Sequence, residues 1–247
     1  MTGRGFIKFM KLSEKACIAI LFCLIFILRI SLSAYSQNSS SPNGKITGTV
    51  KVLEKKLMGG LKEKDDMSGV LIYLTGFITE PPKQISNLIQ EDKTFHPMLL
   101  PIVAGQTVSF PNHDNIYHNV FSVSPIKSFD LGQYKSTDPP KDVTFDKPGL
   151  VPVFCNIHPQ MISFVLILEN KAFAETAKDG KFIITDVPPG RYTINAWKPK
   201  TQRVNSEIEV LPGRETVVSF ELKEVEKIPP HKRKDGTNYP EGDDWES

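Results

Sequence analysis

The chain has 247 residues, of which 40% are hydrophobic and 23% are charged. This composition excludes a collagen, a coiled coil and a wholly disordered protein, and it leaves room for one or two domains with a buried core. Because 30 basic residues nearly balance 28 acidic ones, the formal net charge of +2 also excludes a nucleic-acid binder that relies on phosphate contacts.

The first 36 residues have the pattern of a secretory signal peptide. Basic residues precede an apolar run at 16–28, and Ala34-Tyr35-Ser36 then fits a small-x-small cleavage site. The run is shorter than the roughly 20 residues that span a membrane, so an uncleaved anchor is the weaker interpretation. No cysteine preceded by small residues follows the run, which argues against a lipid anchor. We therefore predict a periplasmic or otherwise exported protein, without stable membrane insertion after cleavage of residues 1–36.

Removal of this segment changes both the charge and the thiol count. It carries five basic residues and one acidic residue, so the remaining chain has a net charge of −2. It also carries Cys17 and Cys23, which leaves Cys155 as the one cysteine of the exported chain. The odd total of three cysteines already argues against a disulfide framework. A single thiol in an oxidising compartment indicates an intermolecular disulfide, inert burial or a metal site.

The chain from residue 45 to residue 170 reads as one all-β domain. Residues 37–44 form a polar linker before it, and no window after the signal peptide has a convincing helical period. Short β-branched and aromatic runs, bounded by turn residues, predict a β-sandwich or Greek-key barrel. Residues 54–93 contain a charged loop and the least readable stretch of the chain, although 70–74 is a buried strand by its composition. The other strands are expected at 45–51, 95–103, 106–110, 120–123, 141–145, 150–154 and 162–168.

A second, smaller β unit is expected at 171–223. Alternating apolar residues predict half-buried strands at 182–184 and 192–196, and Val187-Pro188-Pro189-Gly190 supplies the turn between them. Two more strands are expected at 208–210 and 216–222. A unit of this size is near the lower limit for an independent core, so it is expected to pack on the first. Residues 224–247 are rich in proline and charge and are predicted to be a disordered tail.

One short stretch carries a set of metal ligands. Cys155, His158 and Met161 place a thiol, an imidazole and a thioether at i, i+3 and i+6. Pro159 interrupts a helix there, so we predict a tight loop that turns the three side chains toward one point. His118, 37 positions upstream, is far enough away for the chain to return on a neighbouring strand. Two imidazoles, a thiolate and a weak axial thioether are the ligands of a blue-copper electron-transfer site, whereas Met is a poor ligand for zinc.

These segments resemble the cupredoxin family, and the short Cys-x-x-His-x-x-Met loop is most similar to the loops of its amicyanin-like and plastocyanin-like members. The resemblance covers residues 45–170. It is carried by four stretches, at 105–112, 118–122, 145–149 and 155–161.

The resemblance implies a Greek-key β-sandwich that holds one copper ion at its end. His118, Cys155, His158 and Met161 would be the ligands. Asn119 would tie the two ligand loops together by hydrogen bonds, from outside the ligand set. His158 would be the partly exposed ligand through which electrons leave.

The second unit resembles the carboxypeptidase regulatory-like, or transthyretin-like, β-sandwich. The stretches that carry this resemblance are 179–182, 186–190 and 192–197. In exported bacterial proteins such modules are usually non-catalytic spacers or docking units, and the resemblance implies that role here.

Three classes of function follow from these patterns. The first is a one-electron carrier that meets a redox partner protein, which the sequence does not name. The alternative is a copper-binding module for storage, delivery or sensing. An enzyme is not expected, because a multicopper oxidase needs additional histidines and the chain has five in all. A Cys-His hydrolase would leave Met161 without a role and has no evident group to orient the histidine.

Overall fold

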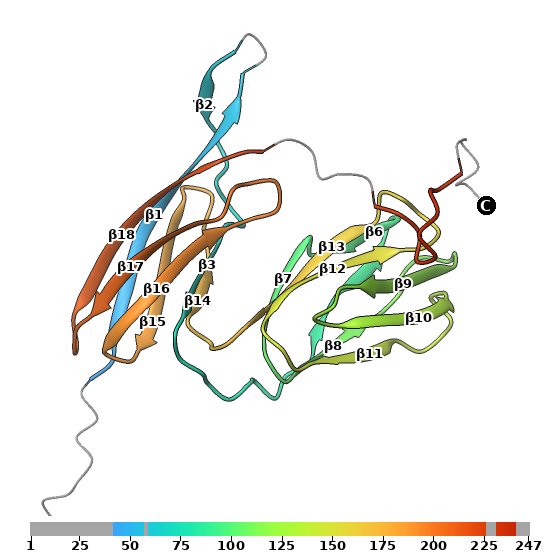
Figure 1. Cartoon of the computed structure of the whole chain (residues 1–247), viewed down its shortest axis with the longest axis horizontal. Coiled ribbons are helices and arrows are strands. Elements are labelled where there is room, and N and C mark those ends of the chain that lie inside the picture. The colour runs from blue at the N-terminus through green and yellow to red at the C-terminus, as the bar shows by residue number, and fades with distance from the viewer. Residues whose placement is uncertain (1–41, 57–58, 226–230, 241–247) are drawn as a thin grey trace, which may run out of the picture. The chain divides into compact units, whose positions relative to one another are not determined.

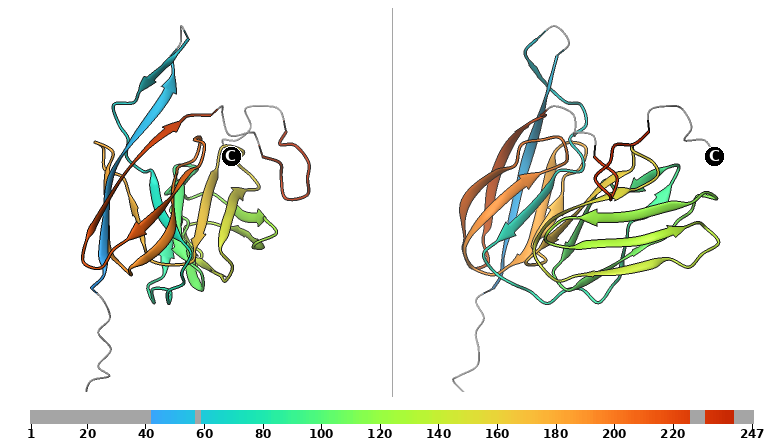
Figure 2. Two further views of the ribbon diagram at one scale, coloured as in Figure 1. Left: turned by 60° about the vertical axis from the view of Figure 1, so that its left-hand side comes forward. Right: turned by 45° about the vertical axis from the view of Figure 1, so that its right-hand side comes forward.

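The computed structural model describes residues 42–56, 59–225 and 231–240, and all regular structure in them is β. Figures 1 and 2 show the strands of two sandwiches, the first built from residues 44–75 and 173–223 and the second from residues 86–168. The predicted all-β class is therefore confirmed. The predicted signal peptide lies outside the described residues. In the part of the chain described, no helix is long and apolar enough to cross a membrane.

The outer sandwich combines strands from residues 44–75 with strands from residues 173–223. Its first sheet contains, in spatial order, β15 (Lys181–Val187), β1 (Gly44–Lys55) and β18 (Glu215–Lys223), with β2 (Leu61–Glu63) paired to β1. Its second sheet contains β14 (Phe173–Glu175), β3 (Leu71–Thr75), β16 (Gly190–Trp197) and β17 (Val204–Val210). Alternate residues of β1 and β3, among them Ile46, Val50 and Ile72, are fully buried between the sheets. The two inner faces thus form one core.

The apolar run of β3 does not alternate, because both of its faces are covered. Ile72 and Leu74 point into the core of the outer sandwich. The other side chains of the strand join a separate cluster with strand β13 (Ile162–Leu168), in which Trp197 meets Phe164 edge-on at 6.0 Å between ring centroids. The members of this second cluster are Leu71, Tyr73, Leu99, Phe164, Leu166, Leu168 and Trp197.

The inner sandwich contains the predicted ligands. Its larger sheet has the order β10 (Ser128–Tyr134), β9 (His118–Val123), β12 (Gly149–Cys155), β13 and β7 (Leu99–Val103). Its smaller sheet has the order β11 (Lys141–Phe145), β8 (Gln106–Phe110) and β4 (Ser86–Asn87), and β5 (Ile89–Glu91) forms a hairpin with β6 (Thr94–His96). A core that includes Phe110, Phe145, Val153 and Cys155 fills the space between the sheets.

The boundary predicted between the two domains, at residues 170 and 171, is contradicted by the sheets. Strands β1 and β3, which the sequence places in the copper domain of 45–170, pair with β18, β15, β14 and β16 instead. The inner sandwich, β4 to β13, is thus inserted between β3 and β14 of the outer one. The parallel pairing of Lys45 with Glu215 joins residues that are very far apart in the chain, and no local pattern reveals such a contact.

The predicted disordered tail, 224–247, also differs in part from the structure. Residues 231–240 form an ordered turn, in which Gly236 N–H donates to the Arg233 carbonyl and Arg233 N–H to that of Thr237. This segment contacts the inner sandwich, and those contacts order it although its composition is polar.

Candidate metal centre

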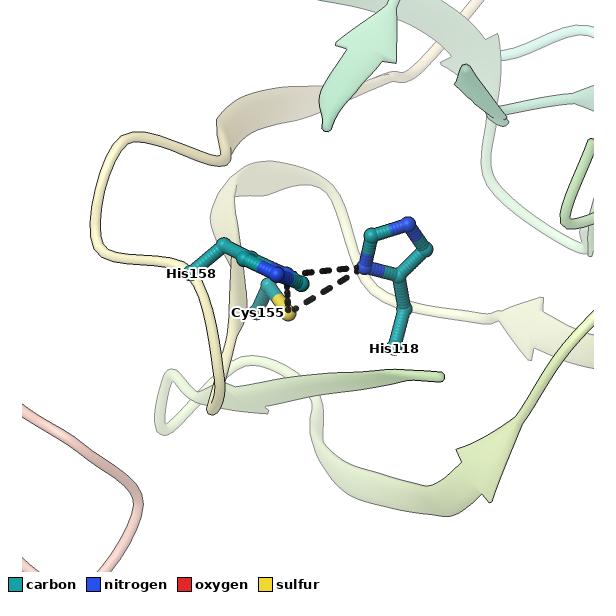
Figure 3. Close-up of side chains that lie close together, drawn as sticks. All are labelled: His118, Cys155 and His158. Atoms are coloured by element: carbon teal, nitrogen blue, oxygen red, sulfur yellow. Dashed lines mark hydrogen bonds between the residues drawn. The ribbon is translucent and has the colours of Figure 1, made fainter. Parts of the chain in front are cut away.

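Three buried side chains of the inner sandwich come together as the sequence predicts. The Nδ1 atoms of His118 and His158 lie 3.0 Å apart, and Cys155 Sγ lies 3.9 Å and 3.7 Å from them, respectively (Figure 3). A metal–imidazole bond is about 2.0 Å and a metal–thiolate bond about 2.3 Å, so two ligand atoms of one ion lie roughly 3–4 Å apart. The three separations fit a single metal ion, and this is the one such cluster found in the described residues.

Strand pairing explains why residues so distant in sequence meet. His118 is the first residue of β9, and Cys155 is the last residue of β12. The two strands are antiparallel, with Cys155 opposite Val120, so the start of one lies beside the end of the other. His158 then returns to the same point through the tight loop that follows β12. Between His118 and Cys155 the chain completes β9 and then forms β10, β11 and β12.

The loop that carries Cys155 and His158 is closed by its own backbone. Cys155 N–H donates to the Met161 carbonyl, and Met161 N–H donates to the His158 carbonyl. The Met161 side chain is fully buried in the same hydrophobic cluster as Cys155. The structure thus places Met161 at the end of the loop, with its side chain in the core cluster that also contains Cys155.

Burial sets the protonation of the three groups. It lowers the pKa of His158 to about 4, with the charge of His118 acting in the same direction. It also lowers the pKa of His118, although Asp114 opposes it. Burial raises the pKa of the Cys155 thiol, against the backbone N–H groups of Asn119, Ile157 and His158. At neutral pH both rings are therefore neutral and able to ligate, while the thiol must lose its proton when a metal binds.

Asp114 holds the far side of the His118 ring. Its Oδ2 lies 2.7 Å from His118 Nε2, and its carboxylate also accepts the N–H groups of Asp92 and Lys93. Burial alone would raise the pKa of Asp114, but these hydrogen bonds outweigh it and the pKa is lowered. An ionised Asp114 keeps the ring proton on Nε2 and leaves Nδ1 for a metal. The sequence analysis did not identify Asp114. The only hint in the sequence is that it lies four residues before His118.

Asn119 contacts the Cys155 loop through its backbone and strand β10 through its side chain. Its carbonyl accepts the N–H of Asn156 at 2.9 Å. Its side-chain amide donates to Asp130 Oδ1 at 2.6 Å and to the Gly132 carbonyl at 3.2 Å. The residue therefore adjoins both ligand segments, but its side chain reaches the Cys155 loop only indirectly.

The predicted exposure of His158 is contradicted. The residue is only 2% exposed, compared with 0% for His118. Its ring packs edge-on against that of His118, with 4.8 Å between centroids, and the closed loop directs it inward. The ligand through which electrons would leave is thus almost completely covered.

The chain matches no protein-family profile and no curated protein. Parts of it are similar to solved structures of copper proteins. An amicyanin from Paracoccus versutus is 25% identical, with 39% of this chain and 96% of that chain covered and a TM-score of 0.32. A purple cupredoxin from Nitrosopumilus maritimus is 21% identical, with 33% and 98% covered and a TM-score of 0.30. A copper-containing nitrite reductase from Thermus scotoductus SA-01 is 25% identical, with 35% of this chain but only 23% of that chain covered and a TM-score of 0.33.

Proposed function

We propose that the chain is an exported protein that binds one copper ion through His118, Cys155 and His158 and passes single electrons. The observation that carries the proposal is the donor set itself, two imidazole nitrogens and one sulfur, all buried and no more than 3.9 Å apart. Copper suits this set better than zinc, because a structural zinc site takes four strong donors. Met161 is proposed as the weak axial ligand.

When bound, the copper supplies a one-electron couple, and the chain keeps its ligands in place. Cys155 releases its thiol proton on binding, and its sulfur accepts the Ile157 N–H at 3.4 Å. His118 is oriented by Asp114, and His158 by the backbone of its loop. Because the ligands lie in a close-packed core, little rearrangement is possible when the charge of the site changes. Low rearrangement is what a rapid electron carrier requires.

A second function is favoured by the burial of His158. A carrier exchanges electrons most easily through an exposed ligand edge, and this ring is only 2% exposed. A site closed in this way also suits copper storage, delivery or sensing, where retention of the ion matters more than electron exchange. The two functions share the same ligands and differ in redox behaviour.

Titration of the purified protein with Cu(II) separates these functions. An electron-transfer site gives an intense visible absorption from thiolate-to-copper charge transfer, and reduction abolishes it reversibly. A colourless complex with one copper per chain would favour storage or delivery. If no copper binds, both functions are excluded. Cys155→Ser should abolish the absorption, whereas Ser163→Ala, a change at a buried polar residue outside the ligand set, should leave it intact.

The remaining features of the protein are proposals of the same kind. We infer that it is not an enzyme, and that it meets a redox partner protein. The outer sandwich would serve as a spacer or docking unit of the carboxypeptidase regulatory-like type. Fractionation of the source cells tests export, and recovery in the cytoplasmic fraction would contradict it.

A further inference from the structure

Residues 231–240, here called the C-terminal clasp, contact the segments that carry the candidate ligands. The clasp follows the last strand of the outer sandwich in sequence, yet it makes hydrogen bonds and a ring contact with β10, β12 and the loop after β12. Its own turn is closed by hydrogen bonds between Arg233, Gly236 and Thr237, and the Asp235 carboxylate accepts the Thr237 N–H. The clasp is therefore an ordered element and not a loose end.

Lys234 of the clasp joins the two ligand segments. Its N–H donates to Asn156 Oδ1 at 2.9 Å, and Asn156 is the residue after Cys155. Its ammonium group contacts Asp130 Oδ2 at 2.5 Å, and the other oxygen of Asp130 accepts the side-chain amide of Asn119, the residue after His118. Lys234 is thus hydrogen-bonded directly to the residue after Cys155 and, through one carboxylate, to the residue after His118.

The ion pair within this network would count for little alone. The side chains of Lys234 and Asp130 are 40% and 43% exposed, and an exposed ion pair adds little to stability because water screens it. Here, however, Asp130 also accepts hydrogen bonds from Asn119 and Gly132. Burial would raise the pKa of this carboxyl, but the hydrogen bond from Lys234 together with these two outweighs burial and lowers the pKa to about 2. The carboxylate is therefore ionised at any ordinary pH and connects three segments at once.

Aromatic side chains of the clasp cover the end of β12. His231 stacks on Phe154 with 4.3 Å between ring centroids, and Tyr239 meets His231 edge-on at 5.2 Å. The Tyr239 hydroxyl donates to the carbonyl of Cys155 itself. The clasp thus contacts the residue before the thiol, the thiol residue and the residue after it.

We propose that the C-terminal clasp is a positioning element that fixes the Cys155 loop and limits access to its thiol. The inference rests on the proposed metal site for its purpose, but its contacts exist without a metal. A buried thiol reacts only when its surroundings open. The contacts of the clasp must break before the Cys155 loop can open, so they raise the free energy of that opening. Lys234 and Tyr239 are the positioning residues, and they act through the backbone of the loop and not as ligands.

The rate at which Cys155 of the metal-free, full-length protein reacts with a chromogenic disulfide reagent tests this inference. A chain that ends at Val225 should react about tenfold faster, and the pair Lys234→Ala with Tyr239→Phe about threefold faster. Cys155→Ser reports the background from Cys17 and Cys23. Lys232→Ala removes an exposed charge of the same segment and should react like the unaltered chain.

Equal thiol reaction rates in all of these chains would contradict the proposal that the clasp limits access to Cys155. If circular dichroism shows that the shortened chain is misfolded, the paired point variants decide. The copper-loaded protein gives a second readout, because the same variants should lose copper to a chelator faster by similar factors. Failure of the unaltered protein to bind copper would reject the proposed function. The thiol reaction rates would still decide whether the clasp limits access to Cys155.

Discussion

Asp114 Oδ2 lies 2.7 Å from Nε2 of His118, so the ring that offers Nδ1 to a metal is held from behind by an ionised carboxylate. A carboxylate in this position fixes the tautomer of the ring and raises its basicity. A neutral acceptor would fix the ring equally well but would add less negative charge. Asp114 therefore links the polar stretch at 112–117 to the properties of a metal on the other side of the ring.

Asp114→Asn should weaken copper binding by about 10- to 100-fold and raise the reduction potential, because a less basic imidazole favours the oxidised ion less. Competition with a chelator measures the affinity, and voltammetry measures the potential. Asp146→Asn is the matched control, since that exposed carboxylate belongs to the same sandwich and lies away from the cluster. If both variants behave alike, the carboxylate has no part in the site.

Met161→Leu should preserve copper binding and the visible absorption, while the reduction potential rises because a weak donor is lost. The buried volume hardly changes, so the cost in unfolding free energy should stay below about 1.5 kcal/mol. Spectra and voltammetry of the copper-loaded protein measure the effect. Met98→Leu, at an exposed methionine, is the control. An unchanged potential would show that Met161 only fills the core.

The metal-free protein should lose stability as the pH falls from about 6.5 toward about 4. Burial lowers the pKa of His158 to about 4 and also lowers that of His118, against the charge of Asp114. The unfolded chain therefore takes up protons below pH 6.5 that the folded chain does not, so the stability of the neutral rings is present above that pH and lost below it. Denaturant unfolding at several pH values measures the trend.

His158→Gln should flatten that pH dependence, because the group with the larger depression of its pKa is gone. A variant with the same slope as the unaltered chain would assign the acid sensitivity to other groups. Copper should suppress the effect in the unaltered protein, since bound metal competes with protons for the same nitrogens.

Gly48→Ala should destabilise the outer sandwich by about 1–3 kcal/mol. A Cβ at Gly48 would lie 2.2 Å from the Val218 carbonyl and 2.7 Å from the Phe182 ring, so neighbouring strands would have to move. Thr49→Ala, at the adjacent exposed position of β1, is the control. Calorimetry should show the loss, while the copper absorption of the inner sandwich stays the same. If both variants lower the free energy of unfolding equally, the close packing around Gly48 does not limit the side chain at that position.

The cluster of His118, Cys155 and His158 was predictable because two of its three members are close together in the sequence. Cys155, His158 and Met161 share one short loop, and the distinct donor chemistry of each side chain narrows the choice of metal. Asp114 could not be predicted, because a carboxylate that supports a ring nitrogen follows no spacing rule. The burial of His158 could not be predicted either, since exposure depends on how the loop closes.

Strand pairing limited the prediction of the fold. Residues 45–51 and 70–74 were correctly predicted as strands, but their partners lie beyond residue 172. Strand β10 was missed, because Gly132 and a register shift between Asp130 and Gln133 break its alternation. The ordered structure of the clasp was also not predicted, because this polar segment is ordered by contacts with residues about 80 to 100 positions away in the chain.

The parallel pairing of β1 with β18 has a mechanical consequence. One strand begins near the start of the described chain and the other ends near its finish, so a pull on the two ends would load their hydrogen bonds in shear. The inner sandwich, inserted between β3 and β14, would be loaded only through its contacts with the clasp. The clasp lies beyond β18 and would be stripped from the Cys155 loop first. Tension on this protein would therefore uncover the thiol before it damaged the strands that carry it.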